Sequence, residues 1–180
     1  MLNIFEKVLV KFMAEIWDIY DINKNKTGRF HQRGIPLNKN DYHIVIHAWV
    51  VNSNDEVIIT KRHKSKKICP DMWECTEGSI LAGEDSIDGA LRELKEEIGL
   101  SFKKDEAVFL TSFVLDFSNT IVDSYMFRRD VNIEDLVLQE NEVSDAMIVN
   151  REKYLEMCKS GEIISSIRYF YDIYDKLNNK

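Results

Sequence analysis

Alternating apolar and polar residues along the chain predict a series of short strands separated by turns. Residues 41–51, DYHIVIHAWVV, are rich in the β-branched and aromatic side chains that favour a strand. A polar turn at 52–56 leads into a returning strand at 56–62, so 41–62 is expected to form a β-hairpin. Further strands are expected at 15–22, 72–80, 107–116, 120–129 and 145–150, of which 107–116 and 120–129 form a second hairpin.

Helical periodicity is found in three segments, and two other segments have no regular pattern. Helices are expected at residues 86–98, 151–161 and 165–177, and loops at 23–41 and 63–71. Gly161 ends the second helix. The third helix has an aromatic stripe that is expected to pack on the sheet, namely Tyr169, Phe170, Ile173 and Tyr174. Interspersed strands and helices predict an α/β (α+β) fold, a mixed sheet flanked by helices.

Length and composition indicate a single globular unit. The chain has 180 residues and a mass of 21.1 kDa, which suits one domain at 14–180 behind a short extension at 1–13. Its 44% hydrophobic and 31% charged residues are typical of a soluble enzyme and exclude a disordered chain. The extension is either an amphipathic helix that packs on the domain or on the second subunit of a homodimer, or a segment without function.

Charge and cysteine content exclude several classes of partner. The net charge of −7 argues against a nucleic-acid polymer, whose phosphates need a basic face. No apolar run approaches the ~20 residues of a membrane span, so no membrane partner is expected. Cys69, Cys75 and Cys158 include no CxxC pair, which disfavours a disulfide scaffold and a zinc knuckle. Reduced thiols and a cytoplasmic location are therefore expected.

The helix at 86–98 has the most informative pattern. Asp85 or Ser86 can cap its N-terminus, and Gly99 can end it. One stripe is apolar and is expected to be buried, namely Ile87, Leu91, Leu94 and Ile98. The opposite side is acidic and is expected to face solvent, and it consists of Glu93, Glu96 and Glu97.

Three carboxylates within one helical turn repel one another, at a cost of a few tenths of a kcal/mol per pair. A divalent cation would offset this repulsion, and hard oxygen ligands suit Mg²⁺ or Mn²⁺ better than zinc. The alternative is a solvated acidic face that binds nothing. The residues around the helix decide between the two interpretations.

Fixed residues from Gly78 to Leu100 follow the spacing GX5EX7REUXEEXGU, where U is aliphatic. Seven fixed residues at ~6% usage each, with two aliphatic sites, match by chance on the order of once in 10⁹–10¹⁰ starting points. The segment resembles the signature of the Nudix hydrolase superfamily at every fixed position. The resemblance implies an α/β/α sandwich that hydrolyses a diphosphate linked to another moiety, with divalent cations held on the signature helix.

The resemblance also implies roles for individual residues. The metal ligands that it implies are Glu93, Glu97, the Gly78 carbonyl and Glu96, the last as a ligand or as the catalytic base. Arg92 belongs to the same catalytic segment, but it is expected to hold loop and helix together by pairing with Glu84. Many Nudix enzymes take their base from a later loop, where this chain has Glu140 and Glu142. Glu142 is therefore a second candidate base, and an ordinary acidic loop is the alternative.

Residues 60–73, TKRHKSKKICPDMW, indicate which branch of the superfamily the chain resembles. Their frame T-x-R-x₂-S-K-K-x₂-P-x₂-W is similar to that of isopentenyl-diphosphate isomerase, a Nudix relative. This similarity implies that Arg62 and Lys66 bind the substrate diphosphate from an open cleft, and it aligns His43 with a metal-ligating histidine of the isomerase. His43 is thus a candidate substrate contact, although His43 and His47 also fit half-buried structural histidines on one strand face.

The similarity to the isomerase fails at the catalytic positions. The isomerase has Cys directly before the signature glycine and His directly after it, whereas this chain has Glu77 and Ser79. The sequence therefore predicts a Mg²⁺- or Mn²⁺-dependent hydrolase of a small nucleoside-diphosphate-like substrate. An isomerase and a non-catalytic nucleotide-binding module are the alternatives. Nucleoside diphosphate sugars, nucleoside triphosphates and dinucleotides all fit the signature.

Overall fold

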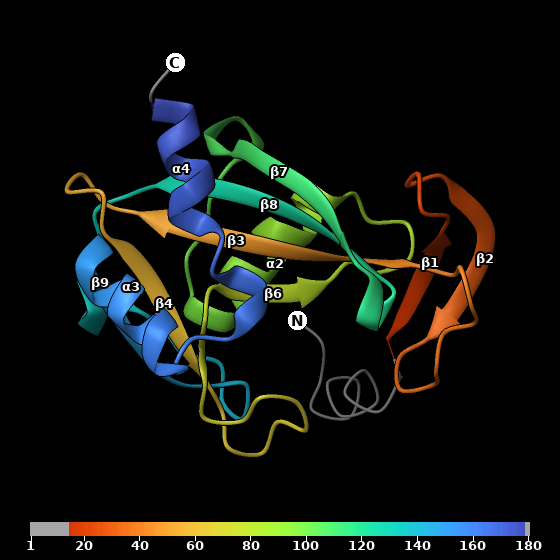
Figure 1. The fold of residues 1–180 in the computed structure, drawn as a ribbon, viewed down its shortest axis with the longest axis horizontal. Helices are drawn as coiled ribbons and strands as arrows, with labels where there is room; N and C mark the ends of the chain where they lie inside the picture. Colours follow the sequence, from red (N-terminus) through yellow and green to blue (C-terminus); the bar gives the residue numbers. More distant parts are fainter. Residues whose placement is uncertain (1–14, 179–180) are drawn as a thin grey trace, which may run out of the picture.

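The computed structural model describes residues 15–178, and the extension at 1–13 lies outside them. The strands are β1 (Ile16–Tyr20), β2 (Lys26–Gln32), β3 (His43–Val51), β4 (Val57–Arg62), β5 (Trp73–Glu74), β6 (Thr76–Ser79), β7 (Val108–Leu115), β8 (Thr120–Arg128) and β9 (Val143–Val149). The α-helices are α2 (Ser86–Ile98), α3 (Arg151–Ser160) and α4 (Phe170–Asn178), with 3₁₀ turns at Lys104–Glu106, Asp116–Ser118, Ile133–Asp135 and Ser165–Ile167. Helices cover both faces of a mixed sheet (Figure 1), which confirms the expected fold class.

Strand β3 is the centre of the main sheet, whose order is β5–β4–β3–β8–β7. β8 runs parallel to β3 along its length, whereas β6 and β4 pair with β3 in antiparallel fashion, and β9 pairs with β4. α2 lies on one face of this sheet and α3 and α4 on the other (Figure 1). Because both faces are covered, all 9 residues of β3 are buried.

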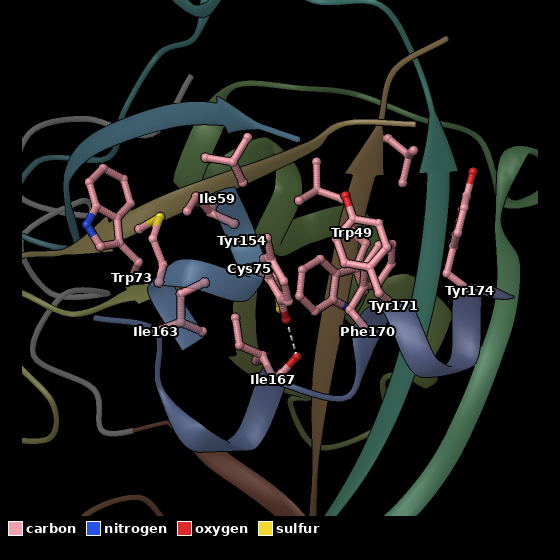
Figure 2. Close-up of a cluster of buried hydrophobic side chains, with 14 of the residues drawn as sticks. Trp49, Ile59, Trp73, Cys75, Tyr154, Ile163, Ile167, Phe170, Tyr171 and Tyr174 are labelled. Atoms are coloured by element: carbon pink, nitrogen blue, oxygen red, sulfur yellow. Dashed lines mark hydrogen bonds between the residues drawn. The ribbon is translucent and has the colours of Figure 1, made fainter. Parts of the chain in front are cut away.

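Side chains of β3 alternate between two hydrophobic cores. Ile44 and Ile46 point to the core beneath α2, which also contains Leu94. Trp49 points to the opposite core, where it stacks on Phe170 with ring centroids 4.2 Å apart. Figure 2 shows this second core, which includes the fully buried Cys75. The aromatic stripe of the last helix therefore packs on the sheet, as predicted.

The loop expected at 23–41 contains a strand, β2, which pairs antiparallel with β1 in a separate two-stranded sheet. The sequence prediction was wrong here because β2 is exposed along nearly all of its length. A strand without a buried face has no alternation of apolar and polar residues to reveal it.

Two other elements differ from expectation in extent. The hairpin at 41–62 opens directly after its turn, where Val51 faces Val57, because β4 then pairs with β9 and β5. The last helix begins at Phe170 rather than at 165. Residues Ser165–Ile167 form a 3₁₀ turn instead of the first turn of an α-helix. The second hairpin, β7–β8, is confirmed.

Within residues 15–178, no helix is both long and apolar enough to cross a membrane.

Candidate active site

Helix α2 begins and ends at the residues that the sequence predicted. Asp85 is its N-terminal cap residue in an extended conformation, although its side chain makes no capping hydrogen bond. Gly99 ends the helix with φ of 76° and an N–H that donates to the Leu94 carbonyl. Leu94 and Ile98 are buried against the sheet, whereas Leu91 is only half-buried. The helix therefore presents a defined side to the loops that precede β5 and β9.

The three signature glutamates do not share one solvent-facing side, contrary to expectation. The Glu96 side chain is 48% exposed and that of Glu93 is 13% exposed, whereas Glu97 is buried with 6% exposure. Glu93 and Glu97 are four residues apart and lie nearer to the apolar stripe than Glu96 does. They are consequently covered by neighbouring strands and loops that a helical projection does not include.

Arg92 organises the first part of the signature. Its guanidinium donates to both oxygens of Glu84, at 2.8 and 3.1 Å, and to the Ser79 carbonyl at 3.0 Å. It also contacts Glu93 Oε1 at 2.7 Å and Glu96 Oε2 at 3.2 Å. The predicted pairing of Arg92 with Glu84 is confirmed, and the same side chain positions Glu93.

Gly78 lies directly beneath the Glu93 carboxylate. A Cβ atom at this position would stand 2.0 Å from Glu93 Oε1, far inside van der Waals contact. Only glycine therefore allows the carboxylate to lie against the backbone of β6. Burial raises the pKa of Glu93 to about 7, against the lowering effect of the Arg92 charge.

Glu97 occupies a pocket of acidic charge. One carboxylate oxygen, Oε2, is buried and has no hydrogen-bond partner. Burial, and after it the charges of Glu74 and Glu93, raise the pKa of Glu97 well above its usual value, while Lys66 acts in the opposite direction. The Lys66 side chain is 20% exposed, so the surroundings of Glu97 reach the surface.

Glu74 is a member of this pocket that the sequence analysis missed. It lies on β5, with a side chain only 4% exposed, and its Oε2 accepts a hydrogen bond from Arg62 Nη1 at 2.6 Å. Burial and the charge of Glu77 raise the pKa of Glu74 to about 8, although Arg62 lowers it. The available signal was an acidic residue inside a short strand that is otherwise apolar or small.

Arg62 and Lys66 reach the same region from β4 and the basic loop. The Arg62 side chain is 13% exposed, so it does not line an open cleft as expected, because it pairs with Glu74 instead. Lys66 forms an ion pair with Glu142, which joins the basic loop to the loop before β9. Glu140 is exposed on that loop. The structure thus brings both predicted phosphate-binding residues to the acidic pocket, each already engaged with a carboxylate.

The two histidines of β3 are more deeply buried than the half-buried state expected. His43 is 9% exposed and stacks on Trp17 with ring centroids 4.2 Å apart. Burial lowers the pKa of His43 to about 4, so its imidazole is neutral at pH 7. His47 is 1% exposed, with Nδ1 2.9 Å from the Tyr169 hydroxyl and Nε2 3.3 Å from Glu77 Oε2.

The donor set of this pocket fits a hard divalent cation. A buried carboxylate oxygen without a partner, on Glu97, is the kind of group that such an ion satisfies. In the part of the chain that the structure describes, no three His, Cys, Asp or Glu side chains are already gathered around a common point. Arg92 instead holds Glu93 and Glu96.

Comparisons with known proteins show which family the chain belongs to. The family model described as the NUDIX domain matches residues 41–169. An uncharacterised Nudix hydrolase of Listeria monocytogenes is 35% identical over 158 residues, which are 87% of this chain and 90% of the relative. The crystal structure of DR0079 from Deinococcus radiodurans superimposes with a TM-score of 0.73 at 22% identity, over 87% of this chain and 96% of that one.

Similarity to an isomerase is more limited. The isopentenyl-diphosphate Δ-isomerase of Corynebacterium diphtheriae is 32% identical over 83 residues, which are 46% of this chain and 44% of the relative. The family model and the Listeria relative each span most of the chain. They show that this chain belongs to the Nudix hydrolase family and is a pyrophosphohydrolase of that family.

Proposed function

We propose that this Nudix hydrolase uses Mg²⁺ or Mn²⁺ to cleave the diphosphate linkage of a small nucleoside-diphosphate-like substrate. The observation that carries the proposal is the buried, unpartnered Oε2 of Glu97. An uncompensated carboxylate is costly to bury, and the charges of Glu74, Glu93 and Glu77 all oppose ionisation of Glu97. A divalent cation would compensate that charge with the oxygen ligands it prefers.

Each signature residue has a role in this proposal. Glu93 and Glu97 hold the cation, together with the Gly78 carbonyl, and the exposed Glu96 is a further ligand or the base. When bound, the cation would neutralise phosphate oxygens and lower the pKa of the attacking water. Arg92 keeps the Glu93 carboxylate over Gly78, through the contact at 2.7 Å.

The cationic residues supply the second half of the site. Lys66 and Arg62 would bind the diphosphate oxygens, for which an ammonium and a guanidinium are suitable donors. In the structure each is paired with a carboxylate, Lys66 with Glu142 and Arg62 with Glu74. A substrate that takes over Lys66 would free Glu142, the loop-borne candidate for the base. His43, neutral and stacked on Trp17, is kept as a candidate substrate contact at the edge of the site.

The similarity of the basic loop to that of the isomerase is compatible with hydrolysis. The similarity to the isomerase covers less than half of this chain. Glu77 and Ser79 occupy the positions at which the isomerase has its catalytic Cys and His, so neither catalytic residue of the isomerase is present. In the pairing of β3 with β6, Glu77 lies opposite His47 and Ser79 lies opposite Val45. We therefore place the isomerase similarity in diphosphate binding and not in the reaction.

The test is a screen of purified protein against nucleoside diphosphate sugars, nucleoside triphosphates and dinucleotides. Product is measured with Mg²⁺, with Mn²⁺ and with chelator. We expect hydrolysis of at least one class that requires the cation, and no conversion of isopentenyl diphosphate. Isomerisation without hydrolysis, or nucleotide binding without turnover across the whole screen, would refute the proposal.

A further inference from the structure

Glu77 directly precedes the signature glycine, and the proposed reaction assigns no role to its carboxylate. Its side chain is 25% exposed, so part of it reaches the surface. Its Oε2 atom is buried and makes no hydrogen bond, and it lies at ion-pair distance, 3.3 Å, from His47 Nε2. Glu77 and Glu97 thus each have a buried carboxylate oxygen that makes no hydrogen bond.

The two carboxylates act on the same pocket from different elements. Glu77 belongs to β6 and Glu97 to α2. The charge of Glu77 acts on Glu97, and the charge of Lys66 acts on both of them. Glu97 is more than nine-tenths buried, so its free oxygen has no exposure to bulk water that would satisfy it. A buried carboxylate oxygen without a hydrogen bond is the kind of group that a divalent cation satisfies, and Glu77 and Glu97 each supply one.

A buried chain of polar groups fixes the position of Glu77. His47 is directly opposite Glu77 in the pairing of β3 and β6. The Tyr169 hydroxyl lies 2.9 Å from His47 Nδ1 and donates to Ser124 Oγ on β8 at 2.8 Å. The imidazole is also stacked on the Tyr169 ring, with centroids 5.9 Å apart. These contacts hold His47 with Nε2 toward Glu77, and they connect the segment before α4 to the signature.

We propose that the Glu77 carboxylate is a further ligand of the divalent cation held by Glu97, and that His47 and Tyr169 are its positioning residues. The sheet then supplies one ligand and the signature helix the others. Carboxylates from two rigid elements define an ion position more narrowly than carboxylates from one helix. This inference rests on the proposed function, because it assumes that Glu97 binds the cation.

The experiment is a Mn²⁺ titration of the substrate-free protein, with unbound Mn²⁺ measured by electron paramagnetic resonance. Wild type is compared with Glu77→Gln, Glu97→Gln, Tyr169→Phe and, as the matched control, Glu134→Gln, an exposed glutamate on a distant 3₁₀ turn. Thermal unfolding of each variant is measured without metal and with saturating Mn²⁺.

We expect Glu77→Gln and Glu97→Gln each to weaken Mn²⁺ binding at least tenfold, which is about 1.4 kcal/mol. Tyr169→Phe should weaken it about threefold, because the imidazole loses one anchor while every carboxylate remains. Glu134→Gln should bind as wild type does. The stabilisation by Mn²⁺ should shrink in the same order.

The outcomes separate this inference from the proposed function. Loss of binding in Glu97→Gln with wild-type affinity in Glu77→Gln would overturn the role of Glu77 and leave the hydrolase proposal standing. Absence of Mn²⁺ binding in wild type would overturn both. If Glu77→Gln does not fold, Tyr169→Phe decides, and a lowered unfolding temperature with unchanged Mn²⁺ affinity would show that the His47 chain is only structural.

Discussion

The carboxylates of the signature have a satisfied side, around Arg92, and an unsatisfied side, around Glu97. Arg92 bonds to Glu84, Glu93 and Glu96 at 2.7 to 3.2 Å. Glu97 is acted on by the charges of Glu74 and Glu77 and has a buried oxygen without a hydrogen bond. The comparison teaches that Arg92 holds the Glu93 carboxylate in place before a cation is bound, whereas the Glu97 oxygen is left for the cation to satisfy. A satisfied carboxylate stabilises the apo fold, whereas an unsatisfied one destabilises it until an ion is bound.

Gly78→Ala should have a larger effect on activity than Arg92→Lys or Lys66→Met. The added methyl group would collide with Glu93 and push its carboxylate away from β6. We expect turnover to fall about a hundredfold, and stability to fall by about 1–3 kcal/mol from overpacking. Gly89→Ala is the control, because its methyl group would crowd Ile80 rather than Glu93. Equal losses of turnover in the two variants would contradict the positioning role of Gly78.

Arg92→Lys tests the satisfied side alone. A lysine keeps the charge but cannot bond Glu84, Glu93 and the Ser79 carbonyl together, as the guanidinium does. We expect the free energy of unfolding to fall by about 1–3 kcal/mol and turnover by roughly tenfold, because Glu93 loses its anchor. Denaturant unfolding and initial rates measure the two effects. A lysine variant as stable as wild type would show that these bonds do not maintain the loop and helix.

The signature could be recognised from the sequence because the residues that define it lie close together in the chain. The periodicity of α2 and Gly99 specify the helix, and the four- and eight-residue spacings place Arg92 near Glu96 and Glu84. The surroundings of Glu97 could not be predicted in this way, because the charged groups that act on it from outside the helix come from β5, β6 and the basic loop.

The other misses have the same physical origin. Glu74 enters the pocket through the pairing of β5 with β4, where it faces Thr60. His47 meets Tyr169 across 122 positions in the sequence. Strand β2 left no pattern because solvent surrounds it. Sequence reasoning therefore identified the residues of the helix and the cations of the basic loop, and missed Glu74 and the contact of His47 with Tyr169.

Lys66→Met sharpens the comparison on the unsatisfied side. It removes the ammonium that acts on Glu97 and pairs with Glu142, while the aliphatic stem is retained. A lost charge-assisted contact of about 1.5 kcal/mol predicts a KM about tenfold higher for a diphosphate substrate. The neighbouring exposed Lys67→Met is the control. If both variants have the KM of wild type, Lys66 does not contact the substrate.

A further prediction, which needs no substitution, concerns the pH dependence of the metal-free protein. Folding raises the pKa of Glu74 to about 8 and that of Glu93 to about 7, so the folded state binds more protons than the unfolded state above about pH 4.5. Stability from these groups is present at low pH and is lost as pH rises toward 8. We expect denaturant unfolding to show a loss of about 1–3 kcal/mol between pH 5 and 8. Saturating Mg²⁺ should reduce this loss, and a stability that rises over the same range would contradict the assignment.

The central claim is that Glu97 is the unsatisfied carboxylate that binds the catalytic cation. The most direct measurement is the turnover of Glu97→Gln with saturating Mg²⁺, alongside its thermal unfolding without metal. We predict that turnover falls at least a thousandfold, because a hard anionic ligand is replaced by an amide of the same shape. The metal-free variant should unfold at the same or a higher temperature than wild type at pH 8, because the amide replaces a carboxyl group whose ionisation is opposed by burial. Wild-type turnover in Glu97→Gln, from a protein that folds normally, would contradict the account.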